Sequence, residues 1–445
     1  MEKHKLQPGE KAKIRAIFFF IGLLLSLPSH VIVNVSFLIN RIYGGDIFVI
    51  VMGIVSGCMI ISSVFQLTFE RTSFNSIMVF NSLNTASMLV LLVGICIFKC
   101  SKIYVYIICG IMGLFIGYLY SACTKYSLLM AIKVNGYMIT GISFSSLFFF
   151  GINLLMSYFT IEEGNVNSYY NAISLSIGTI VSIEFFVILY IMYVQVTSPF
   201  FTEQRQKIEL EICRNANMDK DLSSIEQGKA KKQKSFFSRY ESKSKEGDVH
   251  TSVFTSCKDK IINFKNMFNC TNITHGARLI KYYYTCLIPI SFSIFVSSIV
   301  YPHMIPNKLE KGVYVNYLFM FLYQLSDMLF SLVVTVYLTA FNFLKQKYIV
   351  ILCLSRLIFL GIAFKIMHLE DGSYMRTNWF VSIIIFLLGS TNGSFINISY
   401  ARIGDCFEES STKEKKIAVS SSFCALSLLM SFALAPWFCK VIIDM

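Results

Sequence analysis

Five ionisable side chains lie inside long apolar stretches of the sequence: His30, Lys125, Glu184, Asp327 and Arg356. A charged group at the centre of a membrane helix costs about 2.5–3.5 kcal/mol on insertion scales, so it normally faces a partner or a watered cavity. Because three of these groups can be cationic and two are acidic, they could nearly neutralise one another. We expect Lys125 to pair with Asp327 or Glu184. Glu184 and Arg356 could equally form buried pairs that fix helix register or gate the bundle.

Asp327 is the strongest candidate for binding a solute, because Gln324 and Ser326 lie within one helical turn of it. Amide, hydroxyl and carboxylate groups at this spacing form a hydrogen-bonding wall suited to a ribose or to the edge of a base. Asn392 lies in a later stretch rich in small residues and could face this wall from the other side of a cavity. We therefore expect a substrate-binding wall around Asp327.

Two further groups could line the same site. Lys125 follows Tyr120 and Ser121, so an aromatic ring, a hydroxyl and an ammonium would lie on neighbouring turns. The Lys125 side chain could equally extend to the membrane surface, where its charge would be hydrated. His30, next to Ser29, could bind a proton, but a single histidine beside a hydroxyl is more often a hydrogen-bonded packing residue. All five residues are included in the candidate site.

The elements that must position these groups are membrane helices. The chain has 445 residues, of which 55% are hydrophobic and only 15% charged, and its mean hydropathy is +0.61. A soluble domain carries more surface charge, whereas a bilayer core of about 30 Å takes roughly 20 apolar residues per helix. The first apolar run is too long for a cleavable signal peptide, so we expect it to remain as a span. In all, eleven runs predict spans over residues 16–39, 48–69, 77–98, 103–132, 136–160, 171–197, 282–300, 314–341, 348–368, 378–401 and 417–439.

The distribution of positive charge predicts the orientation of the chain. With the N-terminus in the cytoplasm, the cytoplasmic segments carry 29 of the 39 Lys and Arg residues, whereas the outside connections carry six. The positive-inside rule then predicts a cytoplasmic N-terminus and, with an odd number of spans, an extracellular C-terminus. Because the basic residues flank the spans, the net charge of +13 does not indicate nucleic-acid binding.

The predicted spans form two groups joined by one long connection. We expect a cytoplasmic tail at residues 1–15, a six-helix bundle at 16–197 and a five-helix bundle at 282–445. Residues 198–281 form a basic cytoplasmic linker loop, because they contain too few apolar residues to make a core of their own. The resulting fold class is an all-α polytopic membrane protein with eleven transmembrane helices in a 6+5 arrangement.

Matched interruptions point to a central site between the two bundles. Pro28 lies inside the first predicted span and Pro289 inside the seventh, and these are the opening helices of the two halves. Interruptions in corresponding helices are typical of a transporter's binding site. The fourth and tenth spans are both rich in glycine and small polar residues. In the fourth, Gly113 and Gly117 could serve helix packing alone. A cavity lined by the first, fourth, seventh and tenth spans would explain these features together.

Other function classes lack their signatures. The sequence contains no P-loop, GxSxG, HExxH or dinucleotide motif, so we predict neither an enzyme nor an ATP-driven pump, and no cofactor. No repeated pore-loop motif favours a channel. The 13 cysteines are scattered without metal-ligand spacing, so we predict no metal and interpret them as small apolar packing residues.

Several short motifs follow one another along the predicted spans. They are Leu27-Pro28-Ser29-His30, the segment from Tyr120 to Gly141, Tyr301-Pro302, Gln324-Leu325-Ser326-Asp327, Arg356-Leu357-Ile358-Phe359 and Thr391-Asn392-Gly393. Taken together over nearly all of the spans, these motifs resemble those of the equilibrative nucleoside transporter family. The richness in Asn, Lys and Ile resembles the divergent members of that family found in apicomplexan parasites such as malaria organisms.

The resemblance implies a fold similar to the major facilitator architecture, with six plus five helices around a long cytoplasmic loop. It also implies transport of nucleosides or nucleobases by facilitated diffusion through alternating access. The sequence departs from the family at three positions. Ser331 stands where the family has an arginine after the aspartate of the eighth span, Tyr120 where it has glutamine and Ser29 where it has tryptophan. Ser331 is nevertheless included among the candidate binding residues, and Lys125 could replace the charge that is missing there.

Three alternatives remain open on the sequence. The same fold could move another small solute such as a sugar or an organic anion, since fold does not fix function. Nucleoside transport could be coupled to protons. The basic loop could instead serve a receptor or scaffold that moves no solute. The partners we expect are the small solute and the lipid bilayer, in the plasma membrane, and the sequence does not indicate an oligomeric state.

Overall fold

The structure, a computed structural model, describes residues 8–44, 47–68, 73–130, 134–162, 165–209, 271–305, 309, 313–370, 372–409 and 412–444. In these ranges every regular element is helical, and 11 helical segments are long and apolar enough to cross a membrane. The predicted all-α architecture is therefore confirmed, and the chain is an integral multi-pass membrane protein. Most of the predicted tail at 1–15 is described as part of the first helix, whereas residues 1–7 and 210–270 lie outside the described residues.

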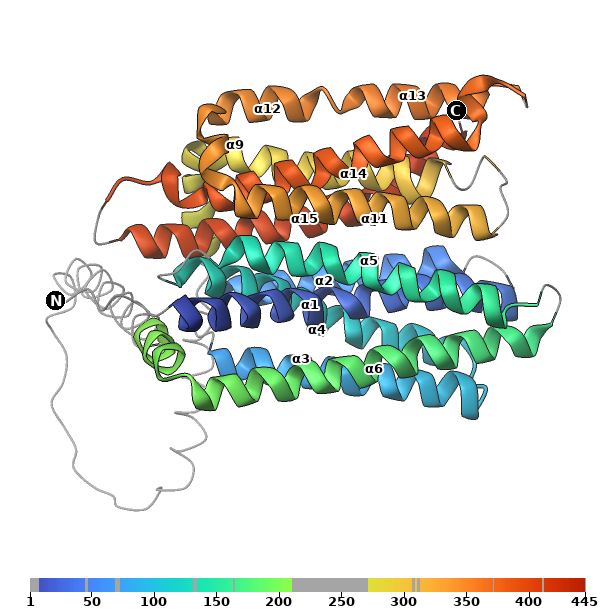
Figure 1. Cartoon of the computed structure of the whole chain (residues 1–445), viewed down its shortest axis with the longest axis horizontal. Helices are drawn as coiled ribbons and strands as arrows, with labels where there is room; N and C mark the ends of the chain where they lie inside the picture. The colour runs from blue at the N-terminus through green and yellow to red at the C-terminus, as the bar shows by residue number, and fades with distance from the viewer. Residues whose placement is uncertain are drawn as a thin grey trace, which may run out of the picture.

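The helices form two halves that lie side by side (Figure 1). The N-terminal half contains α1 (Pro8–Tyr43), α2 (Ile47–Thr68), α3 (Phe74–Leu92), α4 (Lys102–Leu129), α5 (Asn135–Thr160) and α6 (Val166–Thr197). The C-terminal half contains α9 (Thr271–Ser298), α11 (Val313–Val336), α12 (Gln346–Leu354) with α13 (Leu357–His368), α14 (Asn378–Ala401) and α15 (Lys413–Asp444). In Figure 1, α1 begins at the left end of the bundle and α15 ends at the right end.

Corresponding helices pack in the same manner in the two halves. In the N-terminal half α1 lies on α5 and α2 lies on α4, and in the C-terminal half α9 lies on α15 and α11 lies on α14. The halves meet where α5 packs on α11 and where α15 packs on α2 and α4. The interior between the halves is therefore bordered by equivalent helices from both sides.

Glycines set the distance between the helices that flank this interior. A Cβ atom at Gly117 of α4 would lie 2.2 Å from the carbonyl oxygen of Met59 on α2. A Cβ atom at Gly393 of α14 would lie 2.2 Å from the carbonyl oxygen of Asp327 on α11. Only glycine allows the backbones to approach so closely, as in other membrane bundles. The glycines that the fourth and tenth spans share thus serve the same packing in each half.

The opening helix of the C-terminal half breaks at Tyr301. This residue has φ −145° and ψ 126°, an extended conformation within the turn at Ile299–Met304 that follows α9. The next residue is Pro302, whose ring disfavours the helical conformation of the residue before it. The break therefore has a local cause in the sequence, and it brings the Tyr301 hydroxyl within 3.2 Å of the carbonyl oxygen of Asn316.

The ninth predicted span is divided between α12 and α13 at Arg356. The amide of Arg356 bonds to the carbonyl of Cys353 at 3.1 Å, and the amide of Phe359 bonds to the carbonyl of Arg356 at 3.0 Å. These bonds connect residues three apart, so the helix is tightened at this point. The side chain of Arg356 is only 1% exposed, whereas the following residue, Leu357, is 52% exposed.

Residues 199–209, which the sequence places in the linker loop, form a helix on the N-terminal half. Phe201 is fully buried, and its ring lies 5.0 Å from that of Phe74 at the start of α3. Ile208 is also buried. These apolar side chains are spaced two helical turns apart within a polar sequence, which explains why composition alone predicts a loop here.

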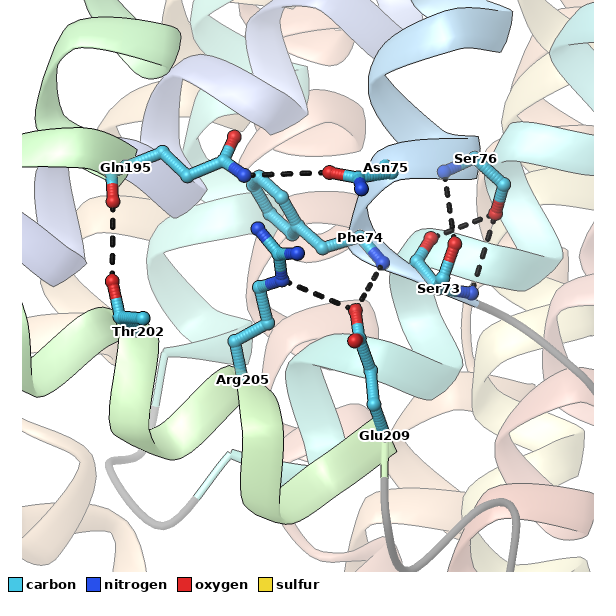
Figure 2. Close-up of polar contacts among 8 residues, drawn as sticks. All are labelled: Ser73, Phe74, Asn75, Ser76, Gln195, Thr202, Arg205 and Glu209. Atoms are coloured by element: carbon cyan, nitrogen blue, oxygen red, sulfur yellow. Dashed lines mark hydrogen bonds and ion pairs between the residues drawn. The ribbon is translucent and has the colours of Figure 1, made fainter.

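A carboxylate at the end of this helix binds the start of α3 (Figure 2). The Glu209 side chain accepts from the backbone amide of Phe74 and from Nε of Arg205, both at 3.2 Å. A negative charge at a helix N-terminus satisfies an otherwise unpaired amide and the positive end of the helix dipole. The first part of the predicted linker is thus fixed to the N-terminal half.

Candidate functional site

A cavity of about 240 Å³ lies between the two halves. Helices α1, α2, α4 and α5 line it from one side, and α9, α11, α14 and α15 line it from the other. The first, fourth, seventh and tenth spans contribute as the sequence predicts, and the second, fifth, eighth and eleventh spans complete the wall. Its volume is just below the range of about 300–1,000 Å³ typical of ligand pockets, so it fits one small solute.

Six of the nine residues that the sequence suggests for substrate binding line this cavity. They are Ser29, His30, Tyr120, Gln324, Asp327 and Asn392. The other three lie elsewhere. Ser121 is buried between α4 and α2, where its hydroxyl bonds to that of Ser63. Lys125 is half-buried on α4 and is not part of the cavity lining. Ser331 is buried one turn below Asp327 on α11.

Asp327 is held in the cavity wall by an amide from the neighbouring helix. Nδ2 of Asn392 donates to Oδ1 of Asp327 at 2.7 Å. The hydroxyl of Ser143, on α5 of the opposite half, is also within hydrogen-bonding reach of this carboxylate. Arg356 contributes a positive charge to the surroundings of Asp327. The pairing of Lys125 with Asp327 or Glu184 stays a prediction.

Glu184 lies away from the cavity, between α6 and α3. The hydroxyl of Thr85 lies 2.6 Å from its Oε2 atom, and the side chain is 1% exposed. A buried carboxyl group bonded to a neighbouring helix fits the sequence-based interpretation of a residue that fixes helix register.

His30 faces the cavity from α1 and is held by hydroxyl groups. Its Nε2 atom is 2.9 Å from the hydroxyl of Ser26 and also bonds to the hydroxyl of Ser146 on α5. The imidazole stacks against Phe149, with 6.2 Å between ring centroids, and meets Phe150 edge-on at 5.8 Å. The imidazole is thus a hydrogen-bonded packing group and at the same time part of the cavity wall.

Four tyrosines bring aromatic surface and phenolic hydroxyls to the cavity: Tyr120, Tyr301, Tyr323 and Tyr400. The rings of Tyr301 and Tyr323 lie 5.7 Å apart between centroids. Sequence reasoning missed Tyr301 as a site residue, although Pro302 after it signals the backbone break that positions it. It also missed Ser143 and Ser146, which share one face of α5 with a spacing of three residues.

Comparisons with known proteins identify the fold. No protein-family model and no curated protein matches the chain. Among solved structures, the proton:xylose symporter XylE bound to 6-bromo-6-deoxy-D-glucose matches with a TM-score of 0.57 and 12% identity, over 99% of this chain and 90% of that chain. The E. coli fucose:proton symporter FucP matches with a TM-score of 0.54 and 11% identity, over 98% of this chain and 92% of that chain.

The chain has the major facilitator fold. In this fold the two helical halves face each other across a central cavity, and here that cavity contains the residues with hydrogen-bonding side chains described above. The 6+5 helix arrangement, which the apolar runs predict, and the similarity to the major facilitator architecture, which the resemblance to a transporter family implies, are therefore confirmed. At these low identities the likeness shows the fold and leaves the solute to be argued from the cavity itself.

Proposed function

We propose that this chain carries nucleosides or nucleobases across a membrane by facilitated diffusion, with its two halves alternately exposing the central cavity to each side. The observation that most supports this proposal is that the cavity combines a carboxyl group in one wall with aromatic side chains. Asp327 and Gln324 offer acceptors for hydroxyl or N–H donors, and Tyr301 and Tyr323 offer apolar ring surface. A nucleoside presents both ribose hydroxyls and a flat base, so it matches both parts of this wall.

The proposal extends to the orientation of the chain. We place the N-terminus in the cytoplasm and the C-terminus outside, in the plasma membrane, because of the excess of positive charge in the predicted cytoplasmic segments. We also propose that transport requires no proton gradient. Two hydroxyls bond to the same atom of His30, Nε2, and an unprotonated Nε2 of a neutral imidazole can accept from them.

Uptake by the purified protein in proteoliposomes tests the solute class. We expect saturable uptake of labelled adenosine that unlabelled nucleosides or nucleobases inhibit and that glucose, xylose and fucose do not. Uptake should equilibrate and persist when the proton gradient is collapsed. Inhibition by the sugars and not by nucleosides would overturn the substrate proposal. Accumulation above equilibrium only with an imposed proton gradient would overturn the equilibrative mechanism.

A sugar is the second candidate. Hydroxyl side chains at Ser29, Thr124, Ser143 and Ser146 line the cavity beside Asp327 and Gln324. Such groups match the several hydroxyls of a pyranose, and the solved structures with this fold include symporters for xylose and fucose. The same uptake experiment separates the two candidates, because a sugar transporter should take up labelled hexose or pentose and be insensitive to nucleosides.

A further inference from the structure

Arg356 carries a buried positive charge behind the wall of the cavity. Its helix otherwise presents apolar side chains outward, and Ile358 is 64% exposed whereas Arg356 is 1% exposed. The tightened turn between α12 and α13 places this one residue inward. Burying a guanidinium is costly unless its surroundings use the charge, so its placement requires an explanation.

A chain of three hydrogen bonds connects Arg356 to Asp327 across four helical segments. Nη2 of Arg356 donates to Oγ of Ser297 on α9 at 2.5 Å. Oγ of Ser297 donates to Oδ1 of Asn392 on α14 at 3.1 Å. Nδ2 of Asn392 donates to Oδ1 of Asp327 on α11 at 2.7 Å. Asn392 and Asp327 line the cavity, whereas Arg356 and Ser297 lie behind it.

Chemistry fixes the direction of this chain from both ends. A guanidinium can only donate, so the hydroxyl of Ser297 accepts from Arg356 and has its own proton free to donate to Asn392. An ionised carboxylate can only accept, so the amide of Asn392 must present its NH2 group to Asp327 and its oxygen to Ser297. Every donor therefore points toward Asp327, and bonds aligned in one direction strengthen one another.

Arg356 differs from a purely structural arginine in the same half. Arg402 donates to the backbone carbonyls of Leu344 and Phe341 and so fastens the end of α14 to the turn after α11. Arg356 donates to Ser297 and to the carbonyl of Leu388, the latter at 3.2 Å. Within the part of the chain that the structure describes, its Nε and Nη1 atoms have no hydrogen-bond partner.

We propose that Arg356 is a positioning residue that acts through Ser297 and Asn392 and sets Asp327 as an acceptor for hydrogen-bond donors of the solute. The relay, defined as Arg356, Ser297, Asn392 and Asp327, occupies one lone-pair direction of the carboxylate. A carboxylate has about four such directions, so others stay free for the cavity. The site therefore selects solutes with hydroxyl or N–H donors at this point and rejects analogues that lack them. This inference rests on the proposed function for the identity of the solute. The hydrogen bonding of Asp327 through the relay does not depend on that identity.

Transport kinetics with paired solutes test the role of the relay. The variants are Arg356→Lys, Arg356→Gln and Ser297→Ala, and the matched control is Arg402→Gln, all as full-length protein in proteoliposomes. We expect Arg356→Gln and Ser297→Ala to raise KM for adenosine about 10-fold with little change in maximal rate, since a hydrogen bond to a charged group contributes about 1.5–3 kcal/mol. The KM for 2′,3′-dideoxyadenosine should be high in the original protein and unchanged in these variants. Arg356→Lys should recover part of the effect.

Infrared spectroscopy tests the relay independently of the solute. The carboxylate stretching band that Asp327→Asn removes should shift in Arg356→Gln and Ser297→Ala and stay in place in Arg402→Gln. The positioning role would be refuted if the band did not move in Arg356→Gln and Ser297→Ala. It would also be refuted if these variants lowered the maximal rate equally for all substrates and left KM unchanged. If the band shifts but adenosine is not transported, the relay stands and the proposed solute is wrong. Thermal melting of each variant identifies any that fail to fold, and Ser297→Ala, which keeps the charge, then decides the outcome.

Discussion

Asp327 and His30 face the same cavity from opposite halves, but their partners give them different capacities. His30 bonds to two hydroxyls, those of Ser26 and Ser146, and both meet its Nε2 atom. Asp327 bonds to the amide of Asn392, which is the last donor of the relay that begins at Arg356. A solute lying between them would meet the carboxyl group and its amide partner on one side and the imidazole with its hydroxyl partners on the other.

Replacing Asp327 by alanine should weaken nucleoside uptake about 10-fold or more, because a hydrogen bond to a charged group is lost. The protein should still reach the membrane, since the deleted side chain faces a cavity and is not packed in an apolar core. Initial uptake rates over a range of adenosine concentrations, normalised to surface protein, measure the effect. Unchanged uptake would remove Asp327 from the site.

Sequence reasoning located several cavity residues but could not separate them from their neighbours. Tyr120 and Ser121 are adjacent, yet only Tyr120 lines the cavity, and Ser121 bonds to Ser63 between two helices. Successive residues of a helix point about 100° apart, so which one faces a cavity depends on the rotation of the helix. That rotation is set by packing against partners far along the chain. Ser143 was missed for the same reason, because it acts on Asp327 from the opposite half.

Among the helices, closely spaced pairs are fixed by glycine, as α2 and α4 show. The Cβ position of Gly117 lies 2.2 Å from the carbonyl oxygen of Met59, which is well inside van der Waals contact. Gly178 on α6 has no atom within 4 Å of its Cβ position. The two positions therefore form a matched pair with the same chemical change and opposite surroundings.

Gly117→Ala should destabilise the protein by roughly 1–3 kcal/mol, as expected for overpacking, whereas Gly178→Ala should be neutral or slightly stabilising. The added methyl group at residue 117 must push α4 away from α2, and at residue 178 it meets open space. Thermal melting of the two purified variants in the same detergent measures the difference. Equal melting temperatures would show that the α2–α4 contact relaxes without loss.

The spans themselves could be predicted because hydropathy directly reflects the length of each segment that lies in lipid. Two other features of the helices could not be predicted from the sequence. The ninth span is divided at Arg356 because this side chain is buried against partners on other helices. No proline or glycine at the point of division signals it in the sequence. The helix at 199–209 depends on two buried apolar side chains and on Glu209 binding the start of α3 (Figure 2). Both are tertiary effects that override local composition.

At the scale of the whole molecule, the two halves are joined by hydrogen bonds where α5 begins and α11 and α14 end. The hydroxyl of Thr335 lies 3.0 Å from that of Thr140 and 3.2 Å from the carbonyl oxygen of Gly136. Asn397 donates to Thr335 at 2.6 Å and to the hydroxyl of Ser331 at 3.1 Å. Ser331 thus belongs to the contact between the halves. The nucleoside transporter family that the sequence resembles has an arginine at this position.

Thr335→Val should favour the state in which the two halves separate at the start of α5 and the end of α11. The substitution removes hydrogen bonds that hold the halves together there. Losing about 1 kcal/mol of net bonding would change the open-to-closed ratio by roughly five-fold. Probes near the start of α5 and the end of α11 would report the change as single-molecule fluorescence transfer. Thr391→Val is the control, since that hydroxyl bonds to the Leu387 and Leu388 carbonyls of its own helix. Equal distance distributions in both variants would contradict the role of the contact.

The orientation of the whole chain can be tested with epitope tags. A tag at the N-terminus should be detected only after the cell is permeabilised, and a tag after Met445 should be detected on intact cells. This follows from the excess of positive charge in the predicted cytoplasmic segments together with an odd number of spans. Detection of the C-terminal tag only in permeabilised cells would reverse the proposed orientation of that end.

The docking of residues 199–209 onto the N-terminal half means that the chain leaving that half is anchored before residue 210, and α9 begins again at Thr271. We expect the connection between these two points to serve only as a tether. Deleting residues 222–250 should therefore leave uptake largely intact, because loop closure changes by only about 0.6 kcal/mol per doubling of length. A tether contributes effective concentration and not contacts. Co-expressing residues 1–221 and 251–445 as separate chains should accordingly restore uptake. At low expression that uptake should rise with the product of the two surface densities, whereas uptake by the intact chain rises in simple proportion to its own.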